Sequence, residues 1–362
     1  MQSMSDYYSA VQLRTDRWSA LREKLGEIER APTGRRVHAL RAEIGKLFDS
    51  LAVVERYWAF PGTAAFDHMR RQFEHGKTAD VAFLVRRVTR ALVSGAYRRR
   101  HIPLDRDSGD ADEHEDEAFL SPDARALSKP YFEVMIVDEV NEHQERWLKS
   151  NMNAMRRTED AFIYEPVVVP SLQDALIGML FNHNVQAIVV RPGLRLESKV
   201  ELPILTRYLS RAGDMDEIRP EDYGPELCRL IARVRPELDA YLVTDRSVED
   251  IAGMDLGVCR RVFYNQEDFL ELHLNILRGV QARFKTPFFT ALKEYSKQPT
   301  GVFHALPISR GKSISRSHWI QDMGAFYGPN IFLAETSATS GGLDSLLEPH
   351  GPIKEAQELA AR

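Results

Sequence analysis

The chain has 362 residues, which is enough for two or three domains. Its hydrophobic content of 43% and charged content of 28% are typical of a soluble globular protein, and its net charge of −5 argues against bulk electrostatic binding to nucleic acid. The sequence has neither an apolar run of about 18 residues nor a basic–apolar pattern at its N-terminus, so it predicts a cytoplasmic protein without a membrane span.

The two cysteines and eleven histidines predict neither a disulfide framework nor a metal site. Cys228 and Cys259 are too few for a disulfide-stabilised fold and fit a reducing compartment. Because their spacing is not that of a metal site, we expect two small, half-buried side chains. No two histidines stand at the i, i+4 spacing of a helical metal site, so we expect His143, His183 and His273 at the surface or satisfied in the core.

Residues 1–100 carry apolar side chains at helical spacing. The stretches 18–28 and 37–58 flank a short breaker at 31–34, which predicts an antiparallel helical hairpin. Two further amphipathic stretches follow the Pro-Gly break at 61–62. The apolar stripes fit a helical bundle or a dimerising hairpin, and we favour the bundle. The apolar positions are Trp18, Leu21, Leu25, Ile28, Val37, Leu40, Ile44, Leu47, Leu51, Val54, Trp58, Phe66, Met69, Phe73, Val81, Leu84, Val85, Val88 and Leu92.

A strongly charged stretch follows and predicts a solvated linker over 101–128. Most side chains from Asp105 to Glu117 are acidic, and so many like charges cannot be buried together. The stretch is like a calcium loop only superficially, because Asp105 and Asp107 lead to Gly109 without a third ligand directly before the glycine.

From Tyr131 the apolar period changes to that of strands. We expect strands at 132–137, 162–169, 185–190, 240–243 and 261–264, with helices at 172–181 and 202–212. Strands that alternate with helices, some of them continuous apolar runs, predict a parallel sheet covered on both faces. The sequence therefore indicates an α/β fold, in which a doubly wound, flavodoxin-like sheet over 129–265 follows the helical region.

The ends of the expected strands resemble those of a response-regulator receiver domain. The first strand leads into Asp138 and Glu139, where receivers hold magnesium-binding acids, and the fourth leads into Thr244, where receivers carry a hydroxyl group. The third leads into Arg191, whose guanidinium cannot accept a phosphoryl group, and no lysine stands at 264–266 after the fifth. We therefore expect a receiver-like packing or regulatory module that takes no part in a phosphorelay.

A linker is expected over 266–317, and it contains no phosphate-binding loop. Gly311–Ser313 has the Gly-Lys-Ser ending of that motif, but the first glycine should stand where the chain has Leu306. We expect Arg310 and Lys312 either to meet an anionic group or to lie on an exposed basic loop.

Four segments near the end of the chain resemble the Orn/Lys/Arg decarboxylase family. They are Thr286–Tyr295, Phe326–Asn330, Gly342–Leu347 and Gly351–Gln357. A receiver-like wing, a linker and a cofactor domain follow one another in that family in the same order. The resemblance implies that 318–362 is the start of a fold-type-I domain that binds pyridoxal phosphate.

Two departures from the family leave the substrate open. The family's Pro-Gly-His loop is replaced by His304–Ser313, and the region 1–128 has no counterpart in the better-known members. The resemblance therefore does not say which amino acid is decarboxylated.

The resemblance implies decarboxylation through a lysine Schiff base with pyridoxal phosphate, whose protonated ring takes up the electrons left when carbon dioxide departs. The family's Schiff-base lysine, its aspartate partner and its phosphate loop fall beyond the position that matches Arg362, so no catalytic or cofactor-binding residue is assigned here. The lysines of this segment are expected at the surface: Lys293, Lys297, Lys312 and Lys354.

The resemblance also implies that a small polar segment lies near the family's active site. Its residues Thr336, Ser337, Ser340 and Asp344 are expected to line the cleft. The local sequence alone offers an alternative, a turn with Asp344 near the start of a short helix.

The last helix has a start signal but no stop signal. Gly351 suits the N-cap and Pro352 the first helical position. Apolar residues recur at Ile353, Ala356 and Ala360, but neither glycine nor proline follows them. Because an amphipathic helix needs a surface to pack on and a C-cap, we expect a fragment of a longer protein.

Three functions stay open on these observations. The leading hypothesis is the N-terminal assembly and regulatory part of a pyridoxal-phosphate-dependent ornithine, lysine or arginine decarboxylase, inactive without the catalytic lysine. The alternative is a non-catalytic signalling or scaffold protein with a degenerate receiver, and the third is an aminotransferase-like activity on the same scaffold. We expect a homodimer or higher homo-oligomer and an amino acid substrate in the complete enzyme, with neither nucleic acid nor membrane as a partner.

Overall fold

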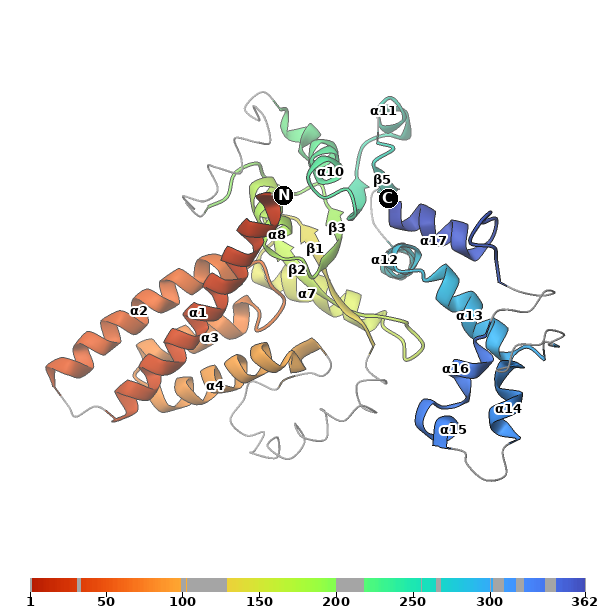
Figure 1. Ribbon diagram of the computed structural model, residues 1–362. Helices are drawn as coiled ribbons and strands as arrows, with labels where there is room; N and C mark the ends of the chain where they lie inside the picture. The colour runs from red at the N-terminus through yellow and green to blue at the C-terminus, as the bar shows by residue number, and fades with distance from the viewer. Residues whose placement is uncertain are drawn as a thin grey trace. The chain divides into compact units, whose positions relative to one another are not determined.

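A computed structural model describes residues 2–30, 34–98, 102, 129–199, 218–254, 256–264, 268–299, 301, 309–316, 322–335 and 343–361 (Figure 1). These residues fall into two compact units, Met1–Val280 and Gln281–Arg362. The linker expected at 101–128 lies almost entirely outside the described residues, and so does the helix expected at 202–212.

The first unit begins with helices whose apolar faces pack on one another: α1 (Gln2–Arg30), α2 (Arg35–Glu55), α3 (Thr63–Glu74) and α4 (Thr78–Ser94) (Figure 1). α1 contacts α2 and α4, and α3 also contacts both of them. The buried ring of Trp18 meets Phe66 edge-on at 6.0 Å between centroids, and Phe66 lies 5.7 Å from Phe48. α4 ends at Gly95, whose φ of 67° favours glycine, and the turn η1 (Ala96–Arg98) follows. The apolar stripes are thus covered within one chain, as in a bundle.

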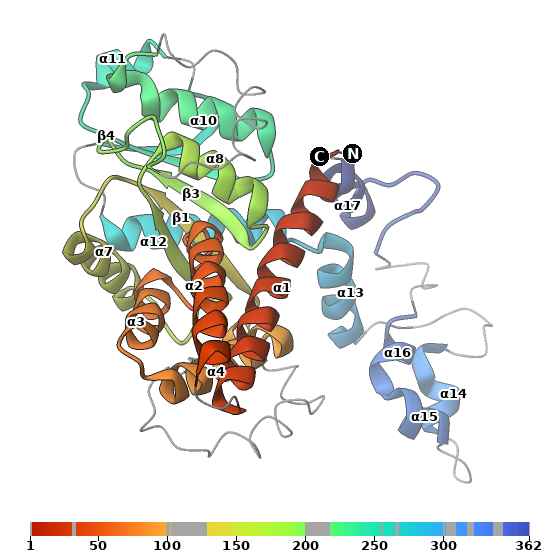
Figure 2. The same ribbon diagram turned by 90° about the vertical axis from the view of Figure 1, so that its left-hand side faces the viewer.

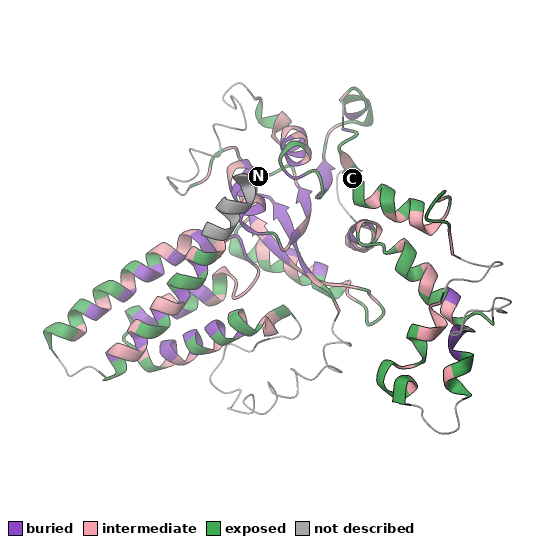
Figure 3. Ribbon diagram, in the orientation of Figure 1, coloured by how far each residue is buried: buried purple, intermediate pink, exposed green. Residues whose placement is uncertain are grey.

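Five parallel strands form the sheet: β1 (Tyr131–Val137), β2 (Ile163–Val169), β3 (Val185–Val190), β4 (Asp239–Thr244) and β5 (Cys259–Tyr264). Their order, β2-β1-β3-β4-β5, is that of a doubly wound, flavodoxin-like sheet. All the expected strands are confirmed, with boundaries that differ by two residues at most. The inner strands β1, β3 and β4 are almost completely buried (Figure 3). The edge strand β5 exposes Arg260 and Arg261.

Helices cover both faces of the sheet: α7 (Glu142–Ala154), α8 (Leu172–Phe181), α10 (Tyr223–Val234), α11 (Val248–Ala252) and α12 (Phe269–Arg283), with the turn η2 (Pro220–Asp222) before α10. Met135 of β1 belongs to an apolar cluster that includes α8 and α10. Its neighbour Ile136 belongs to a second cluster, which includes α7 and α12. Successive side chains of the strand therefore serve opposite faces.

The bundle packs on the face of the sheet that α8 covers (Figure 2). α1 contacts α8, and the ring of Tyr57 meets Phe181 edge-on at 6.5 Å between centroids. Tyr57 is fully buried, and its hydroxyl donates to Asp174 Oδ1 at 2.9 Å. The bundle and the sheet share one hydrophobic core, which the residue patterns of the two segments do not reveal by themselves.

The second unit contains short helices and one turn: α13 (Pro287–Lys297), η3 (Ser309–Gly311), α14 (Lys312–Ser315), α15 (Asp322–Tyr327), α16 (Pro329–Leu333) and α17 (Pro352–Ala361). α13 contacts α16 and α17. Tyr295 is the only aromatic or aliphatic side chain that is buried among the described residues of this unit, while Phe326 and Leu347 are 81% and 99% exposed. Within the described part of the chain, no helix is both long enough and apolar enough to cross a membrane.

We expect Gly279→Ala to destabilise the first unit and Gly45→Ala to stabilise it. A Cβ on Gly279 would lie 2.4 Å from Asp239 Oδ2 and 2.7 Å from the Tyr241 hydroxyl oxygen, so overpacking should cost about 1–3 kcal/mol. Gly45 lies inside α2 with no atom within 4 Å of an added Cβ, and alanine should stabilise that helix by roughly 0.5–1 kcal/mol. Urea unfolding of the two variants gives their free energies of unfolding. Equal urea midpoints for Gly279→Ala and Gly45→Ala would contradict the prediction.

Candidate functional site

The carboxyl edge of the sheet brings together the residues that follow β1, β3 and β4, which is where open parallel sheets bind their ligands. Asp138 follows β1, and its Oδ2 accepts a hydrogen bond from Arg191 Nε at 2.9 Å. The Arg191 backbone N–H donates to Val137 O at 3.1 Å, so the register of β1 and β3 fixes this pair. The sequence-predicted positions at these two strand ends are therefore adjacent.

The second acid of this edge, Glu139, is paired with cations as well. Its Oε1 accepts from Arg195 Nη1 at 2.5 Å and from Lys199 Nζ at 3.1 Å. These bonds, chiefly the one from Lys199, lower the pKa of Glu139. An added Cβ on Gly193 would lie 2.2 Å from Asp138 Oδ1, so a side chain at this position would displace the carboxylate oxygen.

The geometry of this edge does not match the chemistry of a phosphorylated receiver. The guanidinium of Arg191 lies against Asp138, where a receiver would hold its metal ion, and it cannot accept a phosphoryl group. Thr244 at the end of β4 is buried, and its Oγ1 accepts from the Arg246 backbone N–H at 3.2 Å. No group of three or more metal-ligating side chains occurs in the described ranges.

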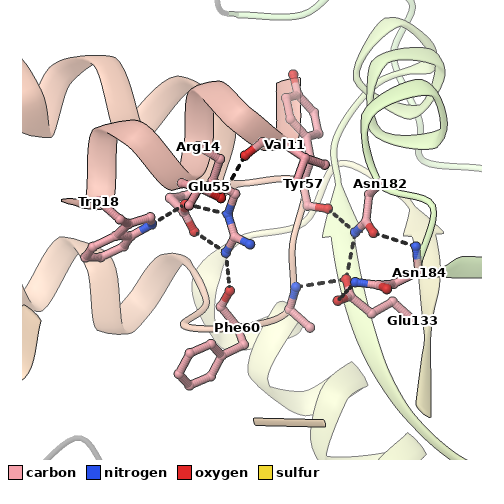
Figure 4. Close-up of polar contacts among 11 residues, drawn as sticks. Val11, Arg14, Trp18, Glu55, Tyr57, Phe60, Glu133, Asn182 and Asn184 are labelled. Carbon is pink, nitrogen blue, oxygen red and sulfur yellow. Dashed lines mark hydrogen bonds and ion pairs between the residues drawn. The ribbon is translucent and has the colours of Figure 1, made fainter. Parts of the chain in front are cut away.

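A second polar arrangement, which we call the seam, joins the bundle to the sheet (Figure 4). On the bundle side, Arg14 Nε and Nη2 donate to the two carboxylate oxygens of Glu55 at 2.7 and 2.9 Å. Arg14 Nη2 also donates to Phe60 O at 2.5 Å, and Trp18 Nε1 donates to Glu55 Oε1 at 2.6 Å. Both charged side chains are more than nine-tenths buried, so this is a bidentate ion pair in the interior.

On the sheet side of the seam, Glu133 of β1 is completely buried. Its Oε2 accepts from the Ala59 backbone N–H at 3.0 Å and from Asn182 Nδ2 at 2.7 Å, and Tyr131 donates to Oε1 at 3.2 Å. Burial raises the pKa of Glu133, while the bonds from Asn182 and Ala59 oppose that rise. Asn182 also donates to Tyr57 O at 2.6 Å, which binds the connector between α2 and α3 to the sheet.

The cysteines and histidines lie much as the sequence predicts. Cys228 is buried and Cys259 is half-buried, and both are free thiols. His143 and His183 are exposed. His273 is 1% exposed, and its ring nitrogens lie 2.9 Å from the Tyr164 hydroxyl and 3.1 Å from Asp160 Oδ2, so it is a hydrogen-bonded core residue.

Asp344 is the only predicted cleft residue within the described ranges, because Thr336, Ser337 and Ser340 lie outside them. Its Oδ1 accepts from the backbone N–H groups of Ser345 and His350, and its Oδ2 from those of Gly351 and Ile353, at 2.9–3.0 Å. These bonds, led by that of His350, lower the pKa of Asp344 to about 2. Asp344 thus caps the start of α17, and its role in a cleft stays a prediction.

The expectation of an exposed basic loop is wrong for Arg310, which is 7% exposed. Its Nη2 donates to Tyr295 O at 2.9 Å, its Nη1 donates to Gln298 O at 3.0 Å, and its guanidinium lies 4.6 Å from the centre of the Tyr295 ring. These contacts satisfy the carbonyls at the end of α13, which needs such donors. Lys312 is exposed, as predicted.

Comparison with known proteins gives two matches in sequence. Residues 286–362 match the family model described as the major domain of the Orn/Lys/Arg decarboxylases. Over 146 residues the chain is 32% identical to the lysine decarboxylase LdcA of Pseudomonas aeruginosa. That alignment covers 38% of this chain and 19% of LdcA, so the matched part spans about a fifth of the length of the curated relative.

Two solved structures are similar in part. The signal receiver domain of an HD domain-containing protein from Pseudomonas fluorescens Pf-5 is 16% identical, with a TM-score of 0.29 over 42% of this chain and 96% of that domain. The lysine decarboxylase LdcF of Francisella novicida is 17% identical, with a TM-score of 0.35 over 63% of this chain and 28% of LdcF. At these TM-scores neither likeness supports a statement about function.

We expect Arg191→Asp to give the carboxyl edge of the sheet a divalent-cation site. The substitution removes the guanidinium and adds a third carboxylate beside Asp138 and Glu139, and magnesium prefers such oxygen ligands. Thermal unfolding with and without magnesium should show stabilisation by the ion. Arg191→Leu is the matched control, because it removes the same charge and adds no oxygen ligand. An equal effect of magnesium on both variants would contradict the expectation.

We expect Asp344→Asn to loosen the start of α17. A carboxyl whose pKa is lowered to about 2 stabilises the fold fully above its ordinary value of 3.8 and loses that effect as the pH falls through about 2. Amide hydrogen exchange at Gly351 and Ile353 should therefore be faster in Asp344→Asn at neutral pH. Glu358→Gln, an exposed change in the same helix outside its first turn, serves as the control, and equal exchange in both variants would refute the capping role.

Proposed function

We propose that this chain, which belongs to the Orn/Lys/Arg decarboxylase family, is the assembly and regulatory part of a pyridoxal-phosphate-dependent decarboxylase that acts on a basic amino acid. The observation that carries the proposal is the match of 286–362 to the major domain of that family. The same region holds the segments in which the sequence itself resembles the family. We propose that the protein works in the cytoplasm.

The described residues do not fit pyridoxal phosphate. A lysine that forms a Schiff base must meet the cofactor in a pocket that excludes water, and the lysines of the matched region are exposed: Lys293, Lys297, Lys312 and Lys354. A cavity of about 470 Å³ in the second unit is lined by Arg310, Gly311 and Phe332 among others, but by no lysine. We therefore assign no catalytic step to this chain and propose that the cofactor-binding lysine lies in other sequence of the enzyme.

The contribution of this chain would then be structural. At the carboxyl edge of the sheet, Asp138 and Glu139 are paired with cationic side chains. These ion pairs suit a receiver-like domain that packs against other parts of an enzyme better than a receiver domain that is phosphorylated. In the second unit, Phe326, Leu346 and Leu347 are each more than 80% exposed, and an interface between copies of the chain would remove such side chains from water. We propose a homo-oligomeric enzyme on this basis.

One observation favours a second candidate, a non-catalytic scaffold derived from a receiver. The ion pair of Asp138 and Arg191 would disable the signalling chemistry of a receiver while it preserves the fold. Such a protein would bind its partners through its surfaces and would need no cofactor. The two candidates differ in whether a cofactor and turnover appear when the rest of the family's major domain is present.

The test compares this chain with a longer version that carries the complete major domain of the family. We expect the chain alone to bind no pyridoxal phosphate and the longer version to show the visible absorbance of the lysine-bound cofactor. The longer version should release carbon dioxide from lysine, ornithine or arginine, and product analysis separates this from amino-group transfer. Turnover by the 362-residue chain alone, or a longer version without cofactor absorbance, would overturn the proposal.

A further inference from the structure

A cavity of about 130 Å³ lies at the seam, between α1, the end of α4 and the loop that carries Asn182. Its lining combines two guanidinium groups with aromatic and aliphatic walls: Arg14, Trp58, Leu92, Val93, Tyr97 and Arg98. All of these belong to the first unit. Neither the receiver-like edge nor the family-model match over 286–362 includes the lining of this cavity, so its role is a separate question.

The charge that lines the cavity is positive. Arg14 is 7% exposed, and its Nε and Nη2 are engaged by Glu55 and Phe60. Its third nitrogen, Nη1, makes no hydrogen bond with any residue that the structure describes, and Figure 4 shows it turned away from Glu55. Glu55 and Glu133 offset the charge of Arg14 but do not line the cavity. A carboxylate that accepted from this nitrogen would make a charge-assisted hydrogen bond with it.

A second guanidinium stands at the same cavity. Arg98, in the turn η1, donates from Nε to the Tyr97 hydroxyl at 2.9 Å, and its guanidinium lies 5.4 Å from the centre of that ring. Tyr97 is itself stacked on Phe60 at 4.9 Å between ring centroids. The position of Arg98 is thus set by the aromatic stack, and the terminal nitrogens of its guanidinium make no hydrogen bond within the described ranges.

The apolar walls and the volume limit the size of a ligand. Trp58 and Leu92 provide flat and aliphatic surfaces beside the two arginines. A cavity of about 150 Å³ is known to accept a single benzene-sized molecule. We propose that this cavity binds a free small monocarboxylate with a compact aromatic or aliphatic body. Its carboxylate lies between Arg14 and Arg98, and its body lies against Trp58 and Leu92. This proposal does not depend on the proposed decarboxylase function.

Isothermal titration of the 362-residue chain with benzoate tests the proposal directly. We expect saturable binding of benzoate and at least about tenfold weaker binding of benzamide, because the amide has the same shape without the charge that guanidinium groups recognise. Acetate, which has no body to fill the cavity, should also bind more weakly. Arg98→Gln should weaken benzoate binding about tenfold, which is the effect of losing one charge-assisted contact.

Matched variants separate binding from folding. Arg90→Gln changes an exposed charge on α4 that does not line the cavity, so its affinity for benzoate should equal that of the natural chain. Val93→Trp adds bulk at a lining residue that is 75% exposed, and it should abolish binding while the circular dichroism spectrum stays unchanged. The proposal fails if benzoate shows no saturable binding, if benzamide binds equally well, or if Arg98→Gln behaves like Arg90→Gln.

Discussion

Two buried carboxylates, those of Glu55 and Glu133, determine how the helical bundle sits on the sheet. A buried charge costs several kcal/mol unless it is paired and hydrogen-bonded, so the donors must be in place whenever this unit is folded. Glu55 takes its donors from α1, whereas Glu133 takes one from the backbone of Ala59, in the connector between α2 and α3. Because Arg14 also holds the carbonyl of Phe60, the connector is fixed from both sides. The bundle therefore cannot be treated as an independent module.

The carboxyl edge of the sheet uses the same kind of pairing with a different consequence. Asp138 and Glu139 are held by protein cations, but Glu139 and Lys199 are solvent-exposed to a considerable degree. Exposed ion pairs contribute about 0–1 kcal/mol, so the pair of Glu139 and Lys199 can change without loss of the fold. At the seam, by contrast, removal of either partner of the Arg14–Glu55 pair leaves a buried charge. The exposed pair of the edge can therefore be altered at little cost, whereas a change at the seam leaves a buried charge without its partner.

The strands could be predicted from the sequence because most are continuous apolar runs, which are typical of strands buried on both faces. The pairing of Asp138 with Arg191 could be predicted as well, because the two residues follow neighbouring parallel strands. Glu133 is a charged residue within the first apolar run, and it was the one local indication in the sequence that this strand makes the polar contacts of the seam. Its partners could not be predicted, because Ala59 and Asn182 lie 74 and 49 residues away along the chain.

The expectation that Arg310 lies on an exposed loop was wrong for a related reason. Its partners are backbone carbonyls, which every residue offers, so no pattern of side chains marks an arginine that will bind them. Among the residues that the structure describes, the second unit buries little apolar surface around Tyr295, and two polar side chains there bind backbone groups. Arg310 donates to carbonyls at the C-terminal end of α13, and Asp344 accepts from amides at the start of α17. Because α13 and α17 contact each other, the two ends that these side chains satisfy belong to one packed pair. In the described part of this unit, hydrogen bonds to helix ends therefore contribute to stability alongside the apolar burial around Tyr295.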